Sequence, residues 1–148
     1  MKNILAVVLA VLFPLSAMAT DASSPQEFDM IRSAEDVDLS EFLWIKRPVI
    51  VFADTPADPR YAEQIEYLTE RLDDLRVRDV VVLTDTDPSQ NSALRQKLRP
   101  RGFMLVLIGK DGTVYLRKPF PWSVRELSRS IDKMPMRQRE IRERRGDG

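Results

Sequence analysis

The sequence predicts an α/β fold in which a four-stranded mixed sheet carries helices on both faces. Two apolar runs of strand-forming residues, 49–52 and 79–83, are each followed by an Asp-Pro pair that signals the start of a helix. A third run, 103–108, is joined by the turn Gly109-Lys110-Asp111-Gly112 to a fourth strand with alternating apolar residues. The resulting order of elements is β-α-β-α-β-β-α, preceded by a short helix near residues 39–45.

The helices are predicted from their first residues and their apolar periodicity. Asp58 is placed at the N-cap and Pro59 at the first position of a helix whose apolar residues recur every three or four positions. A second helix is expected over 88–98. A third follows the capping box Ser123–Glu126 and ends before Pro135. The apolar stripe of the first helix consists of Tyr61, Ile65, Leu68, Leu72 and Leu75.

Right-handed crossovers are expected to make the first three strands parallel, and the hairpin then makes the fourth antiparallel. A mixed sheet of this size with helices on both faces is typical of the thioredoxin-like fold. An α+β domain with a different strand order is the alternative.

The composition excludes several classes of chemistry. The 148 residues include no cysteine and no histidine. Disulfides, thiol nucleophiles, thiol–disulfide exchange, thiol peroxidase activity and Ser-His-Asp catalysis are therefore ruled out. Enzymes that use carboxylates, lysine or tyrosine stay open, and no cofactor is expected.

The first nineteen residues resemble a cleaved secretory signal. Lys2 precedes an apolar run over 4–13, and Ala17-Met18-Ala19 provides a cleavage site after Ala19. An uncleaved anchor is the alternative. We therefore divide the chain into a signal peptide (1–19), a flexible linker (20–38), a thioredoxin-like domain (39–136) and a charged tail (137–148), and expect a periplasmic or secreted protein.

The balance of basic and acidic residues indicates which classes of partner to expect. Lys+Arg and Asp+Glu both number 23, and removal of Lys2 with the signal leaves 22 basic residues against 23 acidic ones. This near-neutral balance argues against nucleic acid, and against a membrane after signal cleavage. A protein or small ligand in the periplasm is expected instead. The arginine-rich tail is either a solvated helix or a surface that docks on an acidic partner.

The place where thioredoxin-like enzymes carry their cysteine lies between the first strand and the following helix. In this register Asp58 and Tyr61 occupy the two cysteine positions, and Met104 stands where a proline would precede the third strand. Asp58 is either a helix cap or part of a functional site.

A candidate binding crevice is expected where the first two strands end, since ligands of open α/β sheets bind at that edge. Its members are charged residues of the adjoining loops. Lys110 and Asp111 are assigned to it, with turn formation as their alternative role, and the four aspartates of the strand-end loops are weak candidates for a hard cation. The crevice comprises Asp54, Asp58, Arg60, Asp85, Asp87, Lys110 and Asp111.

Five stretches together resemble one known family: Arg47-Pro48, Asp58-Pro59-Arg60 with Gln64, residues 78–81, residues 107–112 and residues 131–137. The family is called domain of unknown function 4174, a thioredoxin- or peroxiredoxin-like domain of secreted bacterial proteins that is related to domains in vertebrate sushi-repeat matrix proteins. The resemblance implies the fold and export, and it implies no reaction.

Taken together, these observations predict an exported thioredoxin-like domain without redox cysteines that acts as a non-catalytic binding or interaction module. The alternative is a non-redox enzyme or a metal-binding protein that uses the aspartate-rich crevice.

Overall fold

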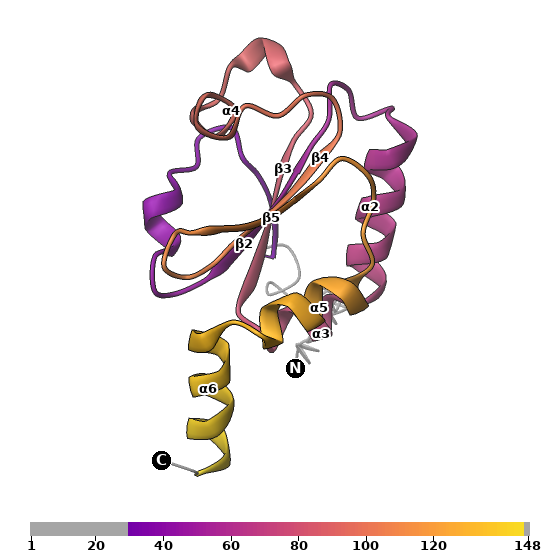
Figure 1. Ribbon diagram of the computed structural model, residues 1–148. Coiled ribbons are helices and arrows are strands. Elements are labelled where there is room, and N and C mark those ends of the chain that lie inside the picture. Colours follow the sequence, from indigo (N-terminus) through magenta and orange to yellow (C-terminus); the bar gives the residue numbers. More distant parts are fainter. Residues whose placement is uncertain (1–29, 147–148) are drawn as a thin grey trace, which may run out of the picture.

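The computed structural model describes residues 30–146. The expected signal peptide and residues 20–29 of the expected linker lie outside this range. A single mixed sheet runs through the domain with helices on both faces (Figure 1), as predicted. Its five strands are β1 (Ile31–Ser33), β2 (Arg47–Phe52), β3 (Val80–Asp85), β4 (Met104–Ile108) and β5 (Val114–Lys118), in the order β1-β3-β2-β4-β5.

The predicted direction of the third apolar strand is wrong. β2 and β3 are parallel, but β4 runs antiparallel to β2, with Phe52 opposite Met104 and Val49 opposite Leu107. The connection explains this, because α4 (Ala93–Leu98) has only six residues and rises about 9 Å. That is too short to return the chain along a six-residue strand of about 20 Å. The chain therefore enters β4 at the edge where β3 ends.

The fifth strand, β1, comes from the segment that was assigned to the linker. It pairs parallel with β3, with Ile31 opposite Val82, and the flanking Met30 and Ala34 are buried. Because β1 has three residues, two of them polar, it carries no apolar run that would mark a strand. The ordered domain thus includes residues 30–38.

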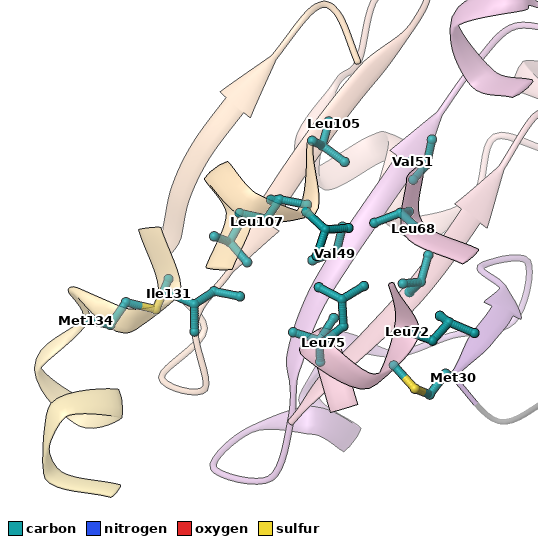
Figure 2. Packing of buried hydrophobic residues seen from close by; sticks show 14 of the residues in the cluster. Met30, Val49, Val51, Leu68, Leu72, Leu75, Leu105, Leu107, Ile131 and Met134 are labelled. Carbon is teal, nitrogen blue, oxygen red and sulfur yellow. The ribbon is translucent and has the colours of Figure 1, made fainter. Parts of the chain in front are cut away.

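One face of the sheet is covered by α2 (Pro59–Glu70), α3 (Leu72–Arg76) and α5 (Val124–Asp132). The stripe that predicts one long helix is divided between α2 and α3, because Arg71 leaves the helical conformation with φ −134° and ψ 40°. Leu68, Leu72 and Leu75 nevertheless face the same core, together with Val49, Leu107 and other residues shown in Figure 2. Ser123 caps α5 as predicted, since its hydroxyl accepts from the Glu126 N–H at 3.3 Å.

A second, smaller core lies on the opposite face. There η1 (Leu39–Phe42) and α4 pack against the sheet, and Phe42, Leu94 and Leu98 contact the inward side chains of Ile50 and Val106. The short η2 (Pro88–Gln90) connects β3 to α4.

The final helix, α6 (Pro135–Arg145), extends away from the body of the domain (Figure 1). The charged tail is therefore helical through Arg145. Between residues 30 and 146, none of the helices has both the length and the apolar character needed to cross a membrane.

Candidate functional site

Asp58 lies at the start of α2, where the structure gives it two roles. One carboxylate oxygen accepts from the Arg60 backbone N–H at 2.9 Å, and the carboxylate also pairs with the Arg60 guanidinium at 3.2 and 3.0 Å. These hydrogen bonds from Arg60 lower the pKa of Asp58. Arg60 in turn lies over the Phe103 ring, 5.7 Å from its centre. Asp58 is thus a helix cap held by its own neighbour.

Replacement of Asp58 tests this capping role. We expect Asp58→Ala to lower the free energy of unfolding by about 1 kcal/mol and Asp58→Asn to lower it by less, because Asn still accepts the backbone N–H. Urea denaturation followed by circular dichroism measures both values. Equal losses for the two variants would contradict the cap assignment.

Tyr61 and Met104, which align with the second cysteine and the proline of thioredoxin-like enzymes, are packed against the two cores. Tyr61 is partly buried against the larger core, and Met104 against the smaller one. No peptide bond between residues 30 and 146 is cis, so the peptide bond before Met104 is trans. The next residue on the inward face of α2, Gln64, is fully buried, and its amide binds the Trp122 carbonyl and N–H at 2.9 and 2.8 Å. This part of the helix therefore holds the chain that leads into α5.

Asp85, at the end of β3, is closed off by an arginine that the sequence analysis missed. Arg95 Nε lies 2.8 Å from Asp85 Oδ1, and the two side chains are 8% and 6% exposed. The Ser92 hydroxyl donates to the other carboxylate oxygen at 2.6 Å, and Arg95 Nη2 donates to the Ala53 carbonyl at 2.7 Å. The guanidinium lies over the Phe52 ring, 5.4 Å from its centre.

This cluster joins the ends of β2 and β3 to α4. The burial of Arg95 could not be predicted from the sequence, because the residue follows an N-cap serine on a short helix with a weak apolar stripe. One combination in the sequence could have revealed it. Ser92 is the N-cap of α4, where its hydroxyl accepts from the Arg95 N–H at 3.2 Å, and an aspartate stands at the end of the preceding strand.

The remaining two aspartates of the strand-end loops, Asp54 and Asp87, belong to no metal-binding cluster within the described residues. Asp87 caps η2 by accepting from the Ser89 N–H at 3.0 Å and hydroxyl at 2.6 Å, and these hydrogen bonds lower its pKa. Asp54 is exposed. In the described part of the chain, no three acidic side chains are grouped so that they could hold a metal ion.

Lys110 and Asp111 were assigned to the same crevice, and the structure places them at the opposite end of the sheet. Because β4 is antiparallel to β2, the turn after β4 lies near the start of β2 rather than its end. Asp111 performs the alternative role of turn formation, since its carboxylate accepts from the Thr113 N–H at 3.1 Å. The candidate crevice is therefore reduced to the five residues of the strand-end loops.

Lys110 instead belongs to a charged network at the end of the sheet where β2 begins. Its ammonium lies 2.8 Å from Asp79 Oδ2 and 2.8 Å from Glu140 Oε1. Glu140 also binds Arg47, which is 1% exposed, at 2.9 Å, and Arg47 donates to the Arg78 carbonyl at 2.8 Å. Burial raises the pKa of Glu140, but hydrogen bonds from Arg47 and Lys110 outweigh it and lower the pKa to about 2.

A second part of the network lies at the junction of α5 and α6. Arg78 forms a two-point ion pair with Asp132 at 3.0 and 2.8 Å, and Arg137 bridges Asp132 and Glu140 at 3.3 and 3.4 Å. Burial opposes ionisation of Asp132, yet the two arginines leave its pKa lowered. The network fixes α6 to the domain, and all of its members except Glu140 come from the stretches that carry the family resemblance.

A groove with a volume of about 590 Å³ lies on the face of the sheet that carries η1 and α4. Its floor is apolar and includes Val37, Phe42, Leu94 and Ile108. Its rim is charged and is formed by Glu35, Asp36, Asp38, Lys46 and Lys97. This groove could not be predicted from the sequence, because its residues come from three separate segments that only the fold brings together.

Comparison with known proteins relates the chain to one family model and one fold. The model described as "Domain of unknown function (DUF4174)" matches residues 38–140. No curated protein matches. Among solved structures, reduced 2-Cys peroxiredoxin from Plasmodium vivax matches with a TM-score of 0.58 and 16% identity, covering 70% of this chain and 85% of its own. Thioredoxin peroxidase I from Plasmodium yoelii matches with a TM-score of 0.51 and 21% identity, covering 76% and 83%.

Proposed function

The chain belongs to the family of Domain of unknown function (DUF4174), and from that premise we propose that it is an exported binding module that performs no catalysis. The fold is that of peroxiredoxins, but the chain has no cysteine with which to perform their chemistry. Asp58, Asp85 and Asp87, the carboxylates at the corresponding edge, are engaged by an arginine, a serine or a helix end.

The groove is the observation that carries the proposal. Its volume of about 590 Å³ falls within the range of ligand-binding cavities, and such cavities combine an apolar lining with a few polar groups. It lies on the opposite face of the sheet from α2, so that binding there leaves the Asp58 cap untouched.

The rim carries three carboxylates against two ammonium groups, so its net charge is negative and favours a cationic ligand. Asp38 caps η1, and the Ser40 hydrogen bonds and nearby Lys97 lower its pKa. Within residues 30–146, no ion pair engages Glu35 or Asp36. An extended peptide that places an apolar side chain on the floor and a lysine or arginine beside these two carboxylates fits the groove. We therefore propose such a basic, apolar peptide segment as the ligand.

The test is a titration of the ¹⁵N-labelled protein with acetyl-Leu-Arg-Leu-amide, followed by NMR. We expect chemical-shift changes at the groove, around Leu94 and Ile108, because the peptide provides both the apolar and the cationic group. The matched peptide acetyl-Leu-Glu-Leu-amide should bind at least tenfold more weakly, since its carboxylate faces Glu35 and Asp36.

A blocking variant and its control complete this test. Ala93 lines the groove and is exposed, so that Ala93→Trp fills the groove from its rim. Ala62→Trp makes the same change at an exposed position of α2. We expect only Ala93→Trp to abolish the shifts. Shifts centred on Asp58 and Asp85, or the absence of shifts at millimolar peptide, would overturn the proposal.

A further inference from the structure

The end of the domain opposite the strand-end crevice exposes apolar side chains beside a helix rich in arginine. Trp44 is 66% exposed, Ile45 61% and Val77 50%. Trp44 and Ile45 lie in the loop before β2, and Val77 lies in the loop before β3. Because β2 and β3 are parallel, the two loops lie at the same end of the sheet.

Printed contacts join these loops to α6. The Trp44 N–H donates to the Lys110 carbonyl at 2.7 Å, and the Lys110 ammonium binds Glu140 of α6. At the far end of the helix, Arg144 Nη1 donates to the Val77 carbonyl at 3.2 Å. The apolar loops and α6 therefore form one continuous surface, which we call the basal surface.

The backbone at Trp44 shows that the loop is held in an unfavourable conformation. Its φ is 66°, in the left-handed region that bulky side chains rarely adopt. Such a conformation persists only where the surroundings enforce it, and here the hydrogen bond to Lys110 does so. The consequence is a tryptophan whose backbone is held in place while about two-thirds of its surface stays exposed to solvent.

The charge of α6 is concentrated on its solvent side. Arg139, Arg142 and Arg145 are exposed, and Glu143 is the one exposed carboxylate between Pro135 and Gly146. The two carboxylates that face the network, Asp79 and Glu140, are already paired with Lys110. In the adjoining turn, Asp111 is occupied with the Thr113 N–H. The basal surface is therefore cationic although the whole chain has no net charge.

We propose that the basal surface binds an anionic lipid bilayer, with Trp44 and Ile45 entering the interface and the arginines of α6 contacting the headgroups. Tryptophan at the interface and arginine near anionic headgroups are the usual means of peripheral membrane attachment. A bilayer suits the surface better than an acidic protein does. The solvent side of α6 offers arginine without an apolar stripe, so it lacks the apolar centre that a protein interface contains. Headgroups can move to meet each arginine separately.

This proposal departs from the expectation that the processed chain avoids membranes. That expectation rests on net charge, which averages over the surface and hides the asymmetry between α6 and the rest of the domain.

The experiment uses the chain processed after Ala19, as the proposed export would produce it, with Trp122→Phe so that Trp44 is the single tryptophan. It is mixed with phosphatidylcholine vesicles, with and without about one-third phosphatidylglycerol, and binding is measured by sedimentation and by tryptophan emission. We expect a blue shift and sedimentation with the anionic vesicles alone, and weaker binding as salt is raised.

Two pairs of substitutions identify the surface. Arg139→Gln/Arg142→Gln should reduce partitioning about 25-fold, at about fivefold for each basic residue. Arg99→Gln/Arg101→Gln, which removes two exposed arginines at the other end of the sheet, should leave partitioning unchanged. Trp44→Asn should also reduce it, and asparagine tolerates the left-handed backbone, so that the fold is kept. Circular dichroism confirms folding of each variant.

Three outcomes would overturn the proposal. They are sedimentation without a blue shift of Trp44, equal losses for the two arginine pairs, and binding to soluble polyglutamate with none to anionic vesicles. The last would assign the basal surface to an acidic protein. Because none of these variants alters the groove, the peptide titration stays an independent test of the proposed function.

Discussion

Asp85→Ala is expected to lower the free energy of unfolding by about 3–5 kcal/mol, the largest effect of any single substitution proposed for this protein. The variant leaves the Arg95 guanidinium buried without its carboxylate, and removes the acceptor of the Ser92 hydroxyl. A buried charge without a partner costs far more than the pair contributes in its favour. Urea denaturation at neutral pH measures the loss.

The control for this prediction is a surface pair of the same chemistry. Asp73 pairs with Arg76 on α3, and the two side chains are 91% and 41% exposed. Asp73→Ala should change stability by less than about 0.5 kcal/mol, because exposed ion pairs contribute little. In the double variant Asp85→Leu/Arg95→Met, both charges are removed together and most of the loss should be recovered. A double variant as unstable as Asp85→Ala would contradict this explanation.

Glu140→Gln is expected to cost up to about 3 kcal/mol at neutral pH, and the cost should depend on pH. The folded-state pKa of Glu140 is lowered from 4.5 to about 2. A lowered pKa contributes stability that is fully present above pH 4.5 and is lost as the pH falls through 2. A shift of this size corresponds to about 3 kcal/mol. The difference between wild type and variant should therefore shrink steadily between pH 4.5 and pH 2.

Denaturation curves at pH 7, 4 and 2.5 test this dependence. Glu143→Gln, three residues further along α6 and exposed, serves as the matched control and should cost less than about 0.5 kcal/mol at every pH. If the cost of Glu140→Gln stays constant from pH 7 to pH 2.5, the carboxylate acts through packing and its charge is not the cause.

Much of the fold could be predicted because buried strands have a recognisable pattern of apolar residues in the sequence. The residues 49–52, 80–83 and 105–108 are buried on both faces of the sheet, and a strand buried on both faces appears as an unbroken apolar run. The caps at Asp58 and Ser123 were predicted correctly because a cap depends on residues two or three positions away.

The direction of β4 and the existence of β1 could not be predicted in the same way. Both depend on partners far along the chain, since β1 pairs with β3 and is too short and polar to form a pattern of its own. The position of Lys110 depends on this direction, because a parallel β4 would place the turn after it at the end of β2 rather than at its start.

The candidate site shows the same limit. Arg47 and Arg95 are arginines with almost no exposure, and an isolated arginine in a sequence indicates solvent. Their burial follows from Glu140 and Asp85, which lie 93 and 10 residues away along the chain. Local pattern identified Asp58 and Asp87 as caps or ligands, and only the three-dimensional arrangement decided between these roles.

The strand order also determines when the domain can fold during its synthesis. β2 is the central strand, yet its neighbours β3 and β4 both follow it in the chain, and β1 pairs with a strand about fifty residues downstream. None of the strand pairs can form early, and the central pair β2–β4 becomes possible only once residue 108 has emerged. Contacts this distant in sequence slow folding. The nascent chain therefore cannot pair its central strand on both sides until almost three-quarters of its length has been made.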